Sequence, residues 1–186
     1  MASYNYWEGE RIRLRAIEPE DQAFFHSFDE DSEASLLISQ IFFPRSQAGD
    51  RRWLEKTMLE ESENDERFLT IELKEHGAIG GISTHACDKR MGTFRYGIGI
   101  GRDYWGKGYA KEAIRILLRY FFEELRYQKV TVNIYAFNER SIKLHESLGF
   151  QHEGRLRRMI HTGGQFHDEL YMGMTREEFA EKMRTL

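Results

Sequence analysis

The sequence predicts a mixed α/β fold, in which one sheet is covered by helices on both faces. Segments with the two-residue period of strands alternate with segments of helical period, and two strand-like runs near the C-terminus flank a Gly-Gly turn. No internal repeat or Pro/Gly/Ser-rich linker interrupts this order. With 186 residues, 40% of them hydrophobic, the chain is long enough for one substantial core and short for two. We therefore expect residues 1–186 to form a single domain.

The first half of the chain has the signals of a strand, two helices and three further strands. Arginines alternate with Ile12, Leu14 and Ala16, which is the pattern of a half-buried strand. Pro19 suits the first turn of a helix, and Ser46 suits the cap of the next one. The expected elements are a strand at 11–17, a helix from Pro19 through Phe28, a helix at 47–61 with Trp53, Leu54, Met58 and Leu59 on its apolar stripe, and strands at 68–73, 78–84 and 93–100.

The second half begins with a glycine-rich turn and a helix, and ends with a hairpin. Apolar residues recur at helical spacing from Ala113 to Phe121, and Gly149 suits the end of a later helix. Thr175 and Glu178 have the spacing of a capping box, which predicts a last short helix. The expected elements are a helix at 109–124, a strand at 129–136, a helix at 138–148, and hairpin strands at 151–161 and 165–174 around Gly163 and Gly164.

Charge and cysteine content exclude several classes of partner. The chain has 27 Lys and Arg against 31 Asp and Glu, so no global basic field would attract nucleic acid or an anionic membrane. Cys87 is the only cysteine, which excludes an internal disulfide and fits a reducing compartment. The polar start carries Glu8 and Glu10, unlike a signal peptide, and no apolar stretch is long enough to span a membrane. We expect a soluble, cytoplasmic protein with no nucleic-acid or membrane partner.

The glycine-rich turn is the first segment that indicates chemistry. The run Trp105-Gly106-Lys107-Gly108-Tyr109-Ala110-Lys111 links the end of a predicted strand to the start of a helix. Small residues there let backbone amides close on an anion, and the helix N-terminus favours negative charge. The run is therefore a candidate phosphate site. It also suits a tight turn alone, because neither the dinucleotide GxGxxG pattern nor the GxxxxGK[ST] loop is matched.

A second segment gives the turn a family context. The run Asn138-Glu139-Arg140-Ser141-Ile142-Lys143-Leu144-His145-Glu146-Ser147-Leu148-Gly149-Phe150 resembles the NxxAxxLYxxxGF pattern of the GNAT acyltransferases. With the glycine-rich turn, it is similar to the branch that contains RimJ/RimL and the spermidine acetyltransferases. The resemblance covers nearly the whole chain in element order. It implies a mostly antiparallel mixed sheet with splayed central parallel strands and helices on both faces.

The resemblance also implies acetyl-CoA as cosubstrate, in a cleft where the two parallel strands separate. The backbone of Ile98, Gly99 and Ile100 would hydrogen-bond the pantetheine arm, and the run from Trp105 to Lys111 would wrap the pyrophosphate. Asn138 and Ser141 would line the other side. Each residue also has a purely structural alternative, in which Asn138 is a helix cap, Trp105 a packing aromatic, and Ile98 and Ile100 core residues.

Two positions depart from the family pattern. Asp103 stands at the first position of the loop written Q/R-x-x-G-x-G/A, and we expect its carboxylate to face solvent. His145 occupies the place where many relatives carry a tyrosine that protonates the departing thiolate. A histidine can supply a proton at neutral pH, so His145 is the candidate catalytic acid. The alternative is a histidine that fills helix surface while solvent protonates the sulfur.

The resemblance implies direct attack of a primary amine on the thioester. Cys87 gives no support for a covalent acyl-enzyme, because no base is predicted beside it. Glu72 and His85 lie on predicted central strands and are candidate bases; no metal is expected. The acidic run at 60–66 suits a cationic acceptor, a small polyamine-like amine or a peptide N-terminus, although such runs also form solvated turns. The alternatives are a non-catalytic acyl-CoA-binding module and a ribosomal-protein-type N-terminal acetyltransferase. The sequence leaves a homo-oligomer open.

Overall fold

The computed structural model describes residues 5–60 and 64–184, and the chain divides into two compact units. The first unit holds the chain up to His85 together with Gly97–Tyr120. The second holds Ala86–Tyr96 and the chain from Phe121 onward. Strand β4 (Thr93–Ile100) contributes residues to both units. The single domain expected for residues 1–186 stays a prediction.

Seven strands form one mixed sheet in the order β1-β2-β3-β4-β5-β7-β6. The pairs β1–β2, β2–β3, β5–β7 and β6–β7 are antiparallel, whereas β4 and β5 are parallel. The parallel register joins Thr93–Arg95 to Lys129–Thr131, and all of these residues belong to the second unit. The predicted mixed, mostly antiparallel sheet is confirmed. The other strands are β1 (Ile12–Arg15), β2 (Phe68–Leu73), β3 (Gly77–Asp88), β5 (Lys129–Tyr135), β6 (Gln151–Thr162) and β7 (Gln165–Thr175).

The N-terminal strand and helices follow the predicted pattern closely. Ile12 and Leu14 are buried while Arg13 is exposed, as the alternation in β1 predicts. Pro19 begins a short 3-10 turn that leads into α1 (Gln22–Glu30). Helix α2 (Ser32–Ile38) was not predicted; its start is marked by Asp31, whose carboxylate accepts a hydrogen bond from the amide of Ala34 at 3.1 Å.

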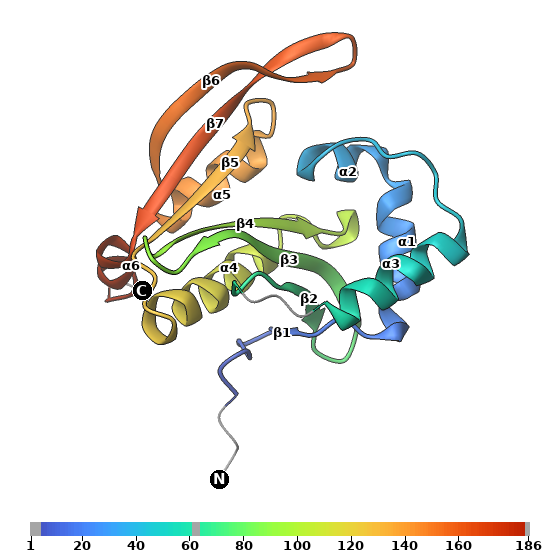
Figure 1. Ribbon diagram of the computed structural model, residues 1–186, viewed down its shortest axis with the longest axis horizontal. Coiled ribbons are helices and arrows are strands. Elements are labelled where there is room, and N and C mark those ends of the chain that lie inside the picture. Colours follow the sequence, from blue (N-terminus) through green and yellow to red (C-terminus); the bar gives the residue numbers. More distant parts are fainter. Residues whose placement is uncertain (1–4, 61–63, 185–186) are drawn as a thin grey trace. The chain divides into compact units, whose positions relative to one another are not determined.

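Helix α3 (Gln47–Leu59) begins at the predicted cap, because the Ser46 hydroxyl accepts from the amide of Gly49 at 3.1 Å. Its apolar stripe is only partly as predicted. Leu54 is buried, but Leu59 is 80% exposed and Met58 is exposed as well. Figure 1 shows α1, α2 and α3 grouped together within the first unit.

The helix predicted at 109–124 changes its geometry before its end. Helix α4 (Tyr109–Arg119) packs beside β1 and buries Ala113, Ile114, Leu117 and Leu118. From Tyr120 to Glu124 the backbone takes wider π-helical turns. None of the helices in residues 5–60 and 64–184 combines the length and the apolar character needed to cross a membrane.

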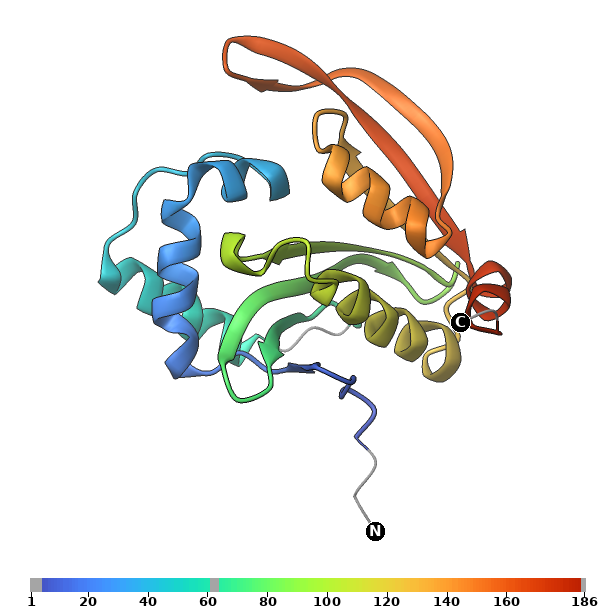
Figure 2. The same ribbon diagram turned by 180° about the vertical axis from the view of Figure 1, so that it is seen from behind.

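The second unit contains the predicted hairpin, which Figure 2 shows as two long strands. Gly163 and Gly164 form its turn with φ of 56° and 74°, a region that suits glycine. Helix α5 (Glu139–Leu148) ends at Gly149, whose φ is 100°, as predicted. Helix α6 (Arg176–Arg184) begins with the predicted capping box, in which Thr175 and Glu178 each bond the other's backbone amide.

Candidate active site

The glycine-rich turn forms an open backbone loop at the start of α4. Gly106 and Gly108 have φ of 73° and 84°, and Gly108 is the cap residue of the helix. A Cβ atom added to Gly106 would meet no atom within 4 Å. The loop therefore has unhindered space beside backbone amides at a helix N-terminus, which fits a bound phosphate. Lys107 is exposed, and its Nζ lies 5.7 Å from the centre of the Tyr104 ring.

The Trp105 side chain anchors the beginning of this loop. Its indole N–H donates to the carbonyl of Ile100 at 2.6 Å, and the Arg102 guanidinium lies 4.9 Å from its ring. Arg102 in turn pairs with Asp31 and Glu33 at the start of α2, and its hydrogen bonds lower the pKa of Asp31 to about 2. The Trp105 ring therefore has a packing role at the start of the loop. Its backbone role at a pyrophosphate stays a prediction.

The end of β4 packs tightly against the helices of the first unit. Ile100 is buried, while Ile98 and Gly99 are half-buried. A Cβ atom on Gly99 would lie 2.3 Å from the Cδ1 of Ile38 and 3.1 Å from the ring of Phe28. A larger residue at this position would therefore have to displace the ends of these two side chains. The contact of Ile98, Gly99 and Ile100 with a pantetheine arm stays a prediction.

Asp103 is exposed in the 3-10 turn that precedes the loop, as expected from the sequence. In the second unit, Asn138 caps α5, because its side-chain oxygen accepts from the amide of Ser141 at 3.0 Å. Asn138 is thus a helix cap. Whether a cofactor also contacts Asn138 and Ser141 is left as a prediction from the resemblance.

His145 lies inside the second unit and is only 2% exposed. Its Nδ1 is 2.8 Å from the carbonyl oxygen of Ser141, which can only accept, so Nδ1 carries the proton. Nε2 is then the acceptor for the hydroxyl of Tyr96 at 2.8 Å. Both ring nitrogens are therefore occupied within the protein.

Burial lowers the pKa of His145 to about 4. At pH 7, roughly one molecule in a thousand would carry the charged imidazolium. The alternative of a histidine that fills helix surface is wrong in its location, because His145 is buried. Its role as proton donor stays a prediction.

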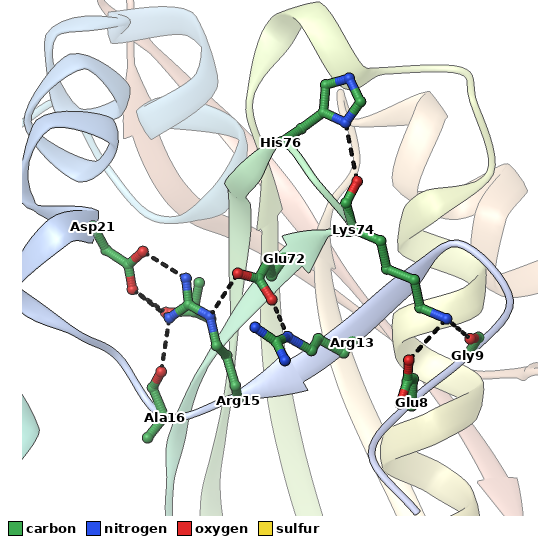
Figure 3. A network of polar contacts seen from close by, with 10 residues as sticks. Glu8, Gly9, Arg13, Arg15, Ala16, Asp21, Glu72, Lys74 and His76 are labelled. Carbon is green, nitrogen blue, oxygen red and sulfur yellow. Dashed lines mark hydrogen bonds and ion pairs between the residues drawn. The ribbon is translucent and has the colours of Figure 1, made fainter. Parts of the chain in front are cut away.

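Glu72 is part of an ion-pair network on β1 and β2 (Figure 3). Arg13 and Arg15 both donate to its carboxylate, and these hydrogen bonds, that of Arg13 first, hold its pKa below the ordinary value. Because a carboxylate held in this way is a weak base, the geometry favours a structural role. His85, the other candidate base, is exposed on β3.

Two further expectations concern a metal ion and the acidic run at 60–66. Among residues 5–60 and 64–184, no cluster of three or more His, Cys, Asp and Glu side chains is arranged to hold a metal ion. Glu60 is exposed, and three members of the acidic run, residues 61–63, lie outside the described part of the chain. Cys87 is half-buried.

Sequence reasoning missed two residues that the structure places at these sites. Tyr96 shares the inward face of β4 with Phe94, and that alternation was the signal that could have found it. The sequence pattern gives Arg11 only a place in the strand expected at 11–17. In the structure its guanidinium reaches the glycine-rich loop, where Nη1 lies 2.8 Å from the carbonyl oxygen of Lys107.

Comparisons with known proteins agree with these features. The chain matches the family described as the acetyltransferase (GNAT) domain over residues 11–151. It is 47% identical over 175 residues to the SPbeta prophage-derived uncharacterized N-acetyltransferase YokL of Bacillus subtilis, covering 94% of this chain and 95% of that protein. It is 23% identical over 186 residues to the spermidine N(1)-acetyltransferase of Escherichia coli K12, covering 94% of this chain and 91% of the relative.

A solved structure shows the same fold. The spermidine N-acetyltransferase of Vibrio cholerae, in complex with CoA and spermine, superposes with a TM-score of 0.79 at 22% identity, covering 92% of this chain and 99% of the other. The family match spans well over half of the chain, and the glycine-rich loop and the Asn138 segment both fall inside it. The chain therefore belongs to the GNAT acetyltransferase family.

Proposed function

We propose that this protein transfers the acetyl group of acetyl-CoA to a primary amine. The observation that carries the proposal is the loop from Trp105 to Lys111, where left-handed glycines precede a helix N-terminus and leave open space above Gly106. Backbone amides in this position suit a diphosphate. The family's acetyl-CoA chemistry supports the choice of cosubstrate.

In this proposal the chain supplies binding and orientation. The amides of the Trp105–Lys111 loop hold the diphosphate, and the backbone of Ile98, Gly99 and Ile100 hydrogen-bonds the pantetheine arm. The thioester supplies the activated acetyl group. A neutral amine attacks its carbonyl, the C–N bond forms and the C–S bond breaks, giving an amide and the CoA thiol. No covalent acyl-enzyme is required.

Two protons must move in this reaction. The ammonium form of the acceptor must lose one, and we assign this step to water, because Glu72 is held by two arginines. The departing thiolate must gain one. A thiol with the ordinary pKa of cysteine, about 8.5, is mostly protonated at neutral pH, so solvent can supply this proton while His145 stays neutral.

The acceptor we favour is a small amine or polyamine, ahead of a peptide N-terminus. The named spermidine acetyltransferases among the relatives support this class, as does the net charge of -4, which favours approach of a cation. A cytoplasmic location and the absence of nucleic-acid and membrane partners remain predictions from composition.

Release of free CoA thiol by the purified protein tests the proposal. We expect release from acetyl-CoA only when an amine is added, together with a product that mass spectrometry finds heavier by one acetyl group. The panel should contain polyamines, amino acids and short peptides. Preference for the peptides would favour the N-terminal acetyltransferase. Tight acetyl-CoA binding without turnover on any amine would favour the non-catalytic module.

A further inference from the structure

The Arg11 side chain connects the start of β1 to the glycine-rich loop. Its Nη1 donates to the carbonyl of Lys107 at 2.8 Å, and its guanidinium carbon lies 4.9 Å from the centre of the Tyr109 ring. Its Nη2 lies 3.2 Å from the point where a Cβ of Gly108 would stand. Arg11 therefore contacts Lys107 and Tyr109 and lies beside Gly108, all within the first unit.

Glu112 in the first turn of α4 holds Arg11 in this position. Its Oε2 accepts from the Arg11 Nε at 3.1 Å, and its Oε1 accepts from the Arg11 backbone amide at 2.8 Å. The amide of Ile12 lies 3.3 Å from the same Oε1. Both oxygens of this carboxylate are thus engaged with Arg11 and the first residue of β1. Its negative charge is balanced by Arg11 rather than left to repel an anion at the helix N-terminus.

The bond to Lys107 also fixes the direction of one amide. In a planar trans peptide, the carbonyl of one residue and the N–H of the next point in opposite directions. Because the Lys107 carbonyl points toward Arg11, the N–H of Gly108 points away from it. The left-handed φ of 84° at Gly108 then leads directly into the helix. A single arginine thus sets the orientation of an amide at the helix N-terminus.

We propose that Arg11 is a positioning residue of this loop, which holds the Gly108 amide toward the diphosphate of the acyl donor. This rests on the proposed function, because it takes the loop to be the diphosphate site. A planar guanidinium can bond Glu112 and the Lys107 carbonyl at the same time, whereas a single ammonium cannot do so with the same geometry. Only an arginine at this position can therefore bond Glu112 and the Lys107 carbonyl together.

The chain offers a matched control two residues further on, in β1. Arg13 pairs with Glu72, and the two side chains are 48% and 15% exposed, against 44% and 16% for Arg11 and Glu112. Replacing either arginine removes an ion pair of similar exposure, but only Arg11 contacts the loop. The experiment compares Arg11→Gln, Arg11→Lys and Arg13→Gln. It measures the melting temperature and the calorimetric affinity for acetyl-CoA. Competition between S-acetylpantetheine and bound acetyl-CoA gives the affinity for S-acetylpantetheine, which has the thioester but no diphosphate.

We expect Arg11→Gln to weaken acetyl-CoA binding by about tenfold or more, because the Gly108 amide would no longer be held toward the diphosphate and its hydrogen bond to that charged group would be lost. Its affinity for S-acetylpantetheine should change less than about twofold, and Arg13→Gln should leave both affinities within the same limit. Arg11→Lys, which retains the charge, should have a several-fold lower affinity for acetyl-CoA and an unchanged affinity for S-acetylpantetheine. It provides the same comparison if Arg11→Gln does not fold.

Equal acetyl-CoA affinities in Arg11→Gln and Arg13→Gln would overturn the inference while the proposed function stands. An equal loss of affinity for acetyl-CoA and for S-acetylpantetheine in the Arg11 variants would also overturn it, because that result would indicate a general structural change and not the loss of a diphosphate contact. A wild-type protein that binds no acetyl-CoA would overturn the proposed function itself.

Discussion

The hydroxyl of Tyr96 donates a hydrogen bond to Nε2 of His145 across 2.8 Å, and both side chains are buried in the second unit. With Nδ1 bonded to the carbonyl of Ser141, this contact defines His145 as a neutral ring with no free nitrogen. The ring of Phe150 packs against both, with centroids 6.4 Å from Tyr96 and 5.0 Å from His145. The pair joins β4 to α5, and its environment is that of a packed core.

Replacing His145 by alanine should therefore lower stability more than turnover. The variant leaves a cavity and an unbonded Tyr96 hydroxyl, so we expect a loss of about 2–4 kcal/mol in the free energy of unfolding. We expect kcat in the folded protein to change less than about threefold. Denaturant unfolding and steady-state turnover provide the two values. A loss of about a hundredfold in kcat with unchanged stability would instead identify His145 as the catalytic acid.

The lowered pKa of His145 predicts that the free energy of unfolding depends on pH. Its pKa is about 4 in the folded protein and ordinarily 6.5, so between these values the unfolded chain binds more protons than the folded one. Stability should accordingly be unaffected above pH 6.5 and should fall from there toward pH 4, by about 3 kcal/mol in total. The measurement is the difference between wild type and His145→Gln over this range. If the difference in unfolding free energy between the two proteins stays constant with pH, His145 has the same pKa in the folded and unfolded chain.

The network in Figure 3 predicts a large effect of Asp21→Asn. Asp21 is 3% exposed and accepts two hydrogen bonds of 2.8 Å from Arg15 and one of 3.1 Å from the Thr70 hydroxyl. Burial alone would raise the pKa of Asp21, but the bonds from Arg15 and the Glu18 backbone outweigh it, and the pKa is lowered. Removing this charge leaves Arg15 without its main partner.

We expect Asp21→Asn to lose about 3 kcal/mol of unfolding free energy, and Arg13→Gln, at the exposed end of the same network, to lose less than about 1 kcal/mol. Chemical denaturation at neutral pH measures both. Similar values for the two variants would show that the buried pair adds little. Because the folded pKa of Asp21 is lowered, its contribution is fully present above the ordinary pKa and is lost as the pH falls below it.

The sequence predicted elements well where burial alternates with a clear period. Strand β1 and helix α4 illustrate this, because their apolar residues recur at the spacing of each structure. Helix α2 was missed, since its seven residues are too few to show a helical period. The exposed Leu59 shows the opposite error, in which an apolar residue at helical spacing faces solvent at the end of α3.

The candidate site was predictable in its backbone and not in its side chains. The glycines at 106 and 108 mark left-handed turns that few other residues adopt, so the sequence alone indicated the loop. The environment of His145 depends on Tyr96, and that of the loop depends on Arg11, each far away along the chain. Such contacts form only when the fold brings the segments together, and no local pattern encodes them.

The open space beside Gly106 allows a direct test of the proposed diphosphate site. Gly106 and the hairpin residue Gly164 have φ of 73° and 74°, and a Cβ at either would meet nothing within 4 Å. Asparagine tolerates this backbone conformation better than most residues, so Gly106→Asn and Gly164→Asn carry similar strain at two different places.

Calorimetric titration of acetyl-CoA into the two variants and the wild type is the decisive measurement. If the diphosphate binds at the loop, Gly106→Asn should weaken the affinity by about tenfold or more, at a melting temperature close to that of Gly164→Asn, whose affinity should equal that of the wild type. Equal affinities in all three proteins would contradict the account, because the amides at Gly106 would then not face the cosubstrate.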